Sequence, residues 1–219
     1  MNNLDIDDIQ KKIGYKFDNL DYLFTAFTHA SYANERAVPS NERLEFLGDS
    51  ILNFVIARCL FDKFPLMDEG FLTKARAKIV SVKPLSAAVE ENDIFKYLRH
   101  AQGTIGEGGA SAKVKSRLFE AIVGAIMLDG GLKFAEEFIL TKLTGAINGD
   151  FSDNNLSDYK SRLLEESRRA GKAVVFVTNA KEGGGFVAIV YVDGKALGTG
   201  EAATKKKAEQ LAAKDAYCS

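Results

Sequence analysis

The chain has 219 residues, of which 46% are hydrophobic and 27% are charged, an ordinary composition for a soluble protein of one large or two modest domains. No apolar run reaches the roughly 18 residues of a transmembrane helix, and the polar N-terminal segment lacks a signal-peptide core. There are only two cysteines, without metal-binding spacing, so we expect a reduced, cytoplasmic protein with no membrane partner.

The net charge of −1 is unevenly distributed. Residues 151–219 contain 11 Lys and Arg against 9 Asp and Glu, whereas residues 1–150 contain 18 against 21. The C-terminal part is therefore mildly basic. This is only a weak indication of a nucleic-acid partner, because binding depends on how charges cluster rather than on their total.

Residues 8–147 show the periodicity of helices almost throughout. Apolar residues recur at helical spacing in Tyr22–Phe27, Leu44–Phe61, Phe71–Val80, Pro84–Glu91, Leu118–Met127 and Phe134–Ile147. No segment alternates cleanly with a period of two, so we expect an all-α first domain over residues 1–147. The polar, turn-rich segment 148–156 is interpreted as a linker.

The pattern changes in residues 157–219. The spacing predicts a helix over Ser157–Arg169, followed by strands over Val174–Thr178, Phe186–Val192 and Lys195–Gly200. Asp193-Gly194 is typical of a hairpin turn, and Thr204 can cap a last helix that extends to Tyr217. These elements predict a small α+β domain with the order α-β-β-β-α.

Three acidic residues share one face of the helix that begins near residue 42. Glu42, Glu45 and Asp49 have the spacing i, i+3 and i+7, which places them within about 60° of one another around the helix axis. Mg²⁺ takes oxygen ligands from one or two carboxylates together with water and phosphate, so this face could hold a hard cation. A solvated acidic face would have the same pattern.

The residues around these acids, Asn41–Leu52 (NERLEFLGDSIL), resemble the signature of the ribonuclease III family, endonucleases that cut double-stranded RNA. Segments 13–17, 28–35, 69–80 and 119–131 resemble further family segments in the same order, and KKKAEQLAA at 205–213 resembles the double-stranded-RNA-binding domain that follows the nuclease domain. The resemblance implies an all-α endonuclease domain (a ribonuclease III-like helical bundle) followed by this α+β domain.

The resemblance also implies a metal site built from two acids of each signature. The first pair corresponds to Glu45 and Asp49, and Glu120 is one member of the second, with Asp49 and Glu120 catalytic and Mg²⁺ (or Mn²⁺ in its place) as cofactor. The fourth position holds Arg117, where the family has an acid. Arginine keeps its proton, so Arg117 either replaces the metal among the acids or turns outward and leaves them to bind metal weakly.

Roles in RNA binding are implied for Glu42, Glu69, Glu165 and Lys205–Lys207, and a role in homodimer formation for Phe46. The lysines suit phosphate contact, because free backbone N–H groups at a helix start add to their charge. Alternatively, Glu42 and Glu69 are ordinary surface acids and Phe46 is a core residue.

The RNA-binding domain departs from the family pattern in two places. Leu164 stands where a polar contact is common, and the loop 180–185 lacks the usual Gly-Pro-x-His pattern. We therefore expect weaker RNA binding than is typical of the family, with strong salt dependence.

The implied function is metal-dependent hydrolysis of double-stranded RNA by a homodimer, with precursors of ribosomal RNA and structured messenger RNAs as substrates. A catalytically silent double-stranded-RNA-binding protein is the alternative that Arg117 favours. His29 and His100 are far apart in sequence, which argues against a histidine-based ribonuclease, and we interpret them as a packed or capping residue and a surface residue. A carboxylate-bridged metal oxidase is disfavoured because Glu-x-x-His pairs are missing.

Overall fold

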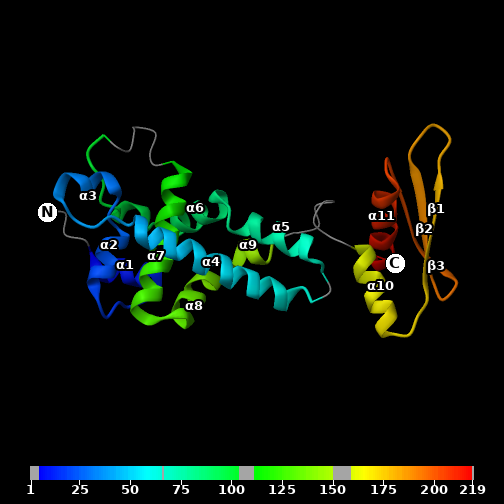
Figure 1. The fold of residues 1–219 in the computed structure, drawn as a ribbon, viewed down its shortest axis with the longest axis horizontal. Coiled ribbons are helices and arrows are strands. Elements are labelled where there is room, and N and C mark those ends of the chain that lie inside the picture. The colour runs from blue at the N-terminus through cyan, green and yellow to red at the C-terminus, as the bar shows by residue number, and fades with distance from the viewer. Residues whose placement is uncertain (1–4, 66, 104–110, 150–158, 219) are drawn as a thin grey trace. The chain divides into compact units, whose positions relative to one another are not determined.

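The structure is a computed structural model that describes residues 5–65, 67–103, 111–149 and 159–218. The chain divides into two compact units, which are residues 1–62 with 75–150 and residues 63–74 with 151–219. Figure 1 labels the helices and strands of both units. None of the described helices combines the length and the apolar character needed to cross a membrane.

The described residues before 150 form helices, as predicted. They are α1 (Ile6–Ile13), α2 (Leu20–Ala26), α3 (Ala30–Arg36), α4 (Glu42–Lys63), α5 (Glu69–Ile79), α6 (Val82–Glu91), the 3₁₀ turn η1 (Phe95–Tyr97), α7 (Ala112–Gly130), α8 (Leu132–Lys142) and α9 (Thr144–Ile147). The helix predicted over Phe134–Ile147 is divided between α8 and α9. The Thr144 hydroxyl donates to the carbonyl oxygens of Leu140 and Thr141 at 2.7 and 2.9 Å, and such side-chain bonds compete with a continuous helix.

The central helix of this helical part is α7, whose residues from 118 to 126 are buried except for Glu120. A helix that is apolar on all sides belongs in a core. Its backbone lies directly against that of α4: a Cβ atom added to Gly48 would lie 2.7 Å from the carbonyl carbon of Glu120, and one added to Gly124 would lie 3.0 Å from that of Leu44. Two glycines therefore fix how closely α4 and α7 cross.

The C-terminal domain has the predicted order: α10 (Tyr159–Arg169), β1 (Val174–Ala180), β2 (Phe186–Val192), β3 (Lys195–Ala202) and α11 (Lys205–Cys218). The strands form an antiparallel sheet in the order β1-β2-β3. At the β2–β3 turn, Asp193 and Gly194 have φ values of 49° and 78°. Positive φ at both positions is the type I′ geometry that Asp-Gly favours, so the predicted hairpin is present.

The core of this domain lies between the sheet and its helices and consists of Leu163, Ala188, Val190, Ala208, Ala212 and Ala213. Small residues on α11 allow a close approach to β3, where a Cβ added to Gly200 would lie 2.6 Å from that of Leu211. Glu209 is buried on α11 and accepts from Lys160 of α10 at 2.7 Å and from Thr178 of β1 at 3.1 Å. This carboxylate ties both helices to the sheet.

Candidate active site

The crossing of α4 and α7 brings together two pairs of charged side chains that lie 68 or more positions apart in the sequence. Glu45 and Asp49 come from α4, and Arg117 and Glu120 come from α7. The start of α4 is anchored by the buried Asn41, whose side chain donates to the carbonyl oxygen of Ala26 at 3.2 Å. The backbone N–H of Asn41 donates to the carbonyl oxygen of Thr28 at 2.9 Å. The acidic face of α4 is thereby held against the rest of the helical part.

Arg117 turns toward these acids and forms an ion pair with Glu45, with 3.2 Å between Nε and Oε1. The side chains are 45% and 23% exposed, respectively. An ion pair with this much solvent contact contributes only about 0–1 kcal/mol, so it can exchange for another partner at low cost.

Glu120 carries the strongest electrostatic perturbation in this group. Its pKa is raised to about 7, first by burial and then by the negative charges of Asp49 and Glu45, while Arg117 opposes them. Burial also raises the pKa of Glu45 and outweighs the opposing effect of Arg117. One guanidinium therefore does not neutralise this site, and an added cation would stabilise the ionised carboxylates.

The donor set partly fits a divalent metal. Carboxylate oxygens are the ligands of Mg²⁺, and two carboxylates suffice when water and phosphate complete the shell. Asp49 and Glu120, which are close enough to interact electrostatically, supply donors of this type. Glu45 is engaged by Arg117, and within the described residues no group of three or more His, Cys, Asp or Glu side chains is arranged to hold a metal. The site fits a cation bound by two carboxylates and not the four-acid arrangement.

His29 lies within electrostatic reach of this site, which its position in the sequence did not predict. Its Nδ1 caps α3 by accepting from the backbone N–H of Ser31 at 3.2 Å. Burial lowers the pKa of His29, and His100 and Arg117 lower it further, whereas Glu42 opposes them. Glu42 itself is exposed in the first turn of α4, where it accepts from Ser40 at 3.0 Å.

Comparison with known proteins matches both parts of the chain. Residues 19–147 match the Ribonuclease-III-like family model, and residues 159–219 match the double-stranded RNA binding motif. Ribonuclease 3 of Leptospira interrogans serogroup Icterohaemorrhagiae serovar copenhageni is 38% identical over 95% of this chain and 88% of its own length. The chain belongs to the ribonuclease III family. By its nuclease domain it is an endoribonuclease.

Other relatives support the same assignment. Ribonuclease 3 of Symbiobacterium thermophilum is 39% identical to this ribonuclease III family member over 93% of this chain and 89% of its own length. The nuclease domain of the ribonuclease III from Campylobacter jejuni aligns with a TM-score of 0.61 and 31% identity, covering 65% of this chain and 98% of the solved one. That nuclease domain has structural flexibility in a region involved in dimer formation.

In this family member, Phe46 is 78% exposed, so the alternative interpretation of Phe46 as a core residue is wrong. Two further phenylalanines of α4 are exposed, Phe54 by 50% and Phe61 by 69%. Their spacing places all three within about 80° around the helix axis. The sequence pattern did not single out Phe54 and Phe61, because apolar residues at helical spacing are usually assigned to a core.

The RNA-binding candidates of this family member lie at the starts of helices and on α10. Lys205, Lys206 and Lys207 are all exposed in the first turn of α11, where Thr204 Oγ1 accepts from the backbone N–H of Lys207 at 3.4 Å. Glu165 forms an ion pair with Arg169 at 3.0 Å. Glu69 is exposed in the first turn of α5 and accepts from Thr73 at 2.8 Å.

Proposed function

We propose that this chain binds double-stranded RNA and hydrolyses its phosphodiester bonds with a divalent cation held by Asp49 and Glu120. The observation that carries this proposal is the raised pKa of the Glu120 carboxyl, caused by burial and by neighbouring acids that Arg117 does not neutralise. A cation at this position would satisfy those carboxylates. Mg²⁺ is the proposed ion and Mn²⁺ its substitute, since both prefer oxygen ligands.

The bound cation would activate water and neutralise charge on the phosphate. The protein residues have separate tasks. Asp49 and Glu120 hold the cation, and Glu45 becomes available as a ligand when Arg117 releases it. Arg117 lowers the affinity for the cation, because its positive charge lies beside the same carboxylates.

Binding of the duplex is assigned to the exposed lysines Lys205–Lys207, with Glu42, Glu69 and Glu165 as further contacts. A-form RNA presents phosphates and 2′-hydroxyl groups, which positive side chains and polar groups can reach without reading the bases. We assign the exposed Phe46 to a homodimer interface, so that each subunit cuts one strand. Ribosomal RNA precursors and structured messenger RNAs in the cytoplasm are the proposed substrates, since they contain such duplexes.

The Arg117–Glu45 ion pair favours a second candidate function. If the guanidinium stays on Glu45 when the metal concentration is high, the domain retains its fold but does not cleave. The chain would then act as a double-stranded-RNA-binding protein with a silent nuclease domain.

The deciding experiment compares the protein with its Arg117→Asp variant on a long RNA duplex over a range of Mg²⁺ concentrations. We expect the variant to need about 10- to 100-fold less Mg²⁺ for half-maximal cleavage. The free-energy difference behind this factor is well below the about 4 kcal/mol per charge pair that Coulomb's law gives at 4 Å and a dielectric constant of 20. The effect is smaller because Arg117 is nearly half exposed to solvent.

The double variant Arg117→Asp/Glu120→Gln is the control, because any cleavage at this site should disappear with Glu120. Cleavage by both the protein and the single variant supports the endonuclease proposal. Cleavage by the single variant alone supports the silent alternative for the natural chain. If neither cleaves while both bind the duplex, the assignment of Asp49 and Glu120 fails.

A further inference from the structure

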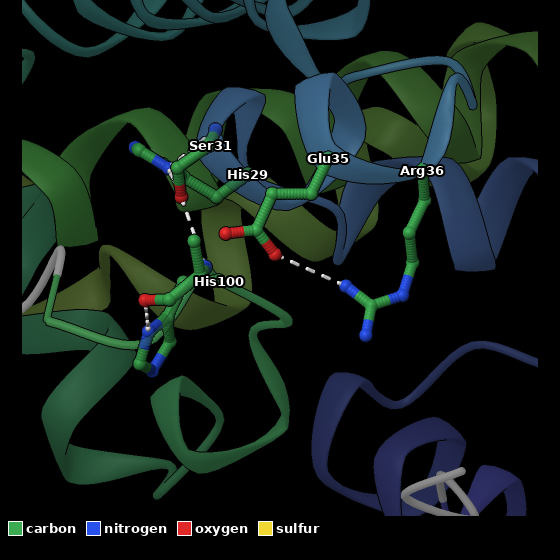
Figure 2. Close-up of polar contacts among 6 residues, drawn as sticks. His29, Ser31, Glu35, Arg36 and His100 are labelled. Carbon is green, nitrogen blue, oxygen red and sulfur yellow. Dashed lines mark hydrogen bonds and ion pairs between the residues drawn. The ribbon is translucent and has the colours of Figure 1, made fainter.

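A chain of hydrogen bonds joins His29 on the N-terminal side of α3 to His100 (Figure 2). The backbone N–H of Ser31 donates to Nδ1 of His29 at 3.2 Å, and the Ser31 hydroxyl lies 2.9 Å from the same nitrogen. The Ser31 hydroxyl oxygen accepts from the backbone N–H of Ala101 at 3.1 Å. Because Nδ1 of His29 accepts, the ring proton is on Nε2, which is a hydrogen-bond donor.

The second ring has the opposite arrangement. Nδ1 of His100 lies 3.0 Å from the carbonyl oxygen of Ala101, and a carbonyl oxygen can only accept. His100 therefore carries its proton on Nδ1, and in the neutral ring Nε2 presents a lone pair. Within the described parts of the chain, neither Nε2 atom takes part in a hydrogen bond or an ion pair.

His29 lies near the candidate active site, and the hydrogen-bond chain links His100 to it. His29 is half-buried, and its electrostatic surroundings include His100, Arg117 and Glu42, the last of these a predicted RNA contact. Because the pKa of His29 is lowered, the neutral ring is favoured near neutral pH. His29 is thus a neutral donor at this place and not a cation.

We propose that His29 and His100, set in opposite tautomers by Ser31 and Ala101, form a subsite that contacts ribose 2′-hydroxyl groups of the RNA duplex next to the acids. A 2′-hydroxyl both donates and accepts, so one such group can accept from Nε2 of His29 and another can donate to Nε2 of His100. A phosphate oxygen only accepts and would match His29 alone. This inference rests on the proposed binding of double-stranded RNA and adds a site that distinguishes RNA from DNA.

A purely structural role for His29 makes different predictions, because a cap needs only Nδ1. His29→Asn keeps an acceptor for the Ser31 N–H and is a good helix cap, but it lacks the Nε2 donor. His29→Gln has the longer side chain, whose amide N–H₂ reaches toward the place of Nε2, but it lacks the short acceptor. The two variants therefore separate capping from ligand contact.

The test measures binding of the full-length variants to an RNA duplex and to a DNA duplex of the same sequence in EDTA, by fluorescence anisotropy. We expect His29→Asn to reduce the preference for RNA over DNA by about two- to tenfold, the effect of one lost hydrogen bond, and His29→Gln to reduce it less. The RNA-binding domain makes the same contribution to the RNA preference of every variant, so this contribution cancels when the variants are compared. A preference that is unchanged in His29→Asn would overturn the proposal.

Arg36→Gln is the matched control. Arg36 lies on the same helix and is exposed beside Glu35, with its guanidinium 4.1 Å from the centre of the Tyr32 ring (Figure 2 shows the Glu35–Arg36 ion pair). Removal of an exposed positive charge weakens binding to RNA and DNA alike, so the preference should stay constant. A drop in preference equal to that of His29→Asn would show that the effect comes from general electrostatics, which also overturns the proposal.

Nitrogen NMR of the imidazole rings gives an independent result, because the chain has only two histidines and each variant removes one set of signals. The free protein should show protonated Nε2 for His29 and protonated Nδ1 for His100. Addition of the RNA duplex should shift both Nε2 signals, whereas the DNA duplex should not. If RNA binds without shifting them, the subsite is wrong, and if no RNA binds at all, the proposed function itself fails.

Discussion

Replacement of Gly48 by alanine tests the crossing of α4 and α7 on which the candidate active site depends. The new Cβ would lie 2.7 Å from the Glu120 carbonyl carbon and 3.0 Å from the backbone nitrogen of Gly124, whereas ordinary contacts begin at 3.4 Å. Both neighbours are backbone atoms, so they cannot rotate away, and α4 must move by roughly 1 Å. Overpacking of this kind costs about 1–3 kcal/mol of unfolding free energy.

The same shift separates Asp49 from Glu120. A misplacement of about 1 Å costs on the order of 100-fold in rate when the catalytic groups must act together. We therefore expect Gly48→Ala to lower the urea midpoint of unfolding and, in an Arg117→Asp background, to reduce cleavage by about that factor.

Gly145→Ala in α9 is the matched control, because a Cβ there has nothing within 4 Å. In a helix this change should be neutral or should stabilise the protein by up to about 1 kcal/mol. If Gly48→Ala unfolds at the same urea concentration as Gly145→Ala, α4 and α7 do not cross in backbone contact.

Three further predictions concern charge and exposed surface. In the folded protein the pKa of Glu120 is about 7, above its ordinary value of 4.5. The contribution of this carboxyl group to the free energy of unfolding is therefore complete below pH 4.5 and is lost as the pH rises toward 7. Glu120→Gln should therefore stabilise the metal-free protein by about 1–2 kcal/mol at pH 8, after allowance for solvent screening, and leave it unchanged at pH 4.5; equal gains in urea melts at both pH values would contradict this. Phe46→Ala should weaken dimer formation by at least about 30-fold in analytical ultracentrifugation, and an unchanged dimer would exclude Phe46 from the interface. Replacement of Lys205–Lys207 by glutamine should weaken RNA binding and reduce the slope of log affinity against log salt by about 1 to 3, whereas an unchanged slope would place the RNA elsewhere.

Local patterns in the sequence were sufficient for most of the fold. The Asp193-Gly194 pair predicted a hairpin because positive φ at two successive residues is a local requirement, and the structure has it. The helices of the first domain were predicted from apolar periodicity, because the spacing of apolar residues indicates which face of a helix is buried. Periodicity could not detect the break before Thr144, because apolar residues continue on both sides of it.

The candidate site was only partly predictable. Motif resemblance brought Glu45, Asp49, Arg117 and Glu120 into one hypothesis, but it left open which way Arg117 points. The direction of Arg117 depends on the distance between α4 and α7. Two glycines set that distance, and no local sequence pattern indicates it. The electrostatic effect of Arg117 on His29 was also missed, because the two residues are far apart in the chain and their proximity depends on tertiary packing.

The Arg117–Glu45 ion pair also has a thermodynamic consequence. In a site made only of acids, metal and RNA bind cooperatively, since the cation removes the repulsion between carboxylates and phosphates, and each ligand raises the affinity for the other by the same factor. A guanidinium among the acids supplies part of that neutralisation before any ligand arrives. We therefore expect binding of the proposed metal and of the nucleic acid to be partly uncoupled, so that a duplex can bind before the proposed metal does.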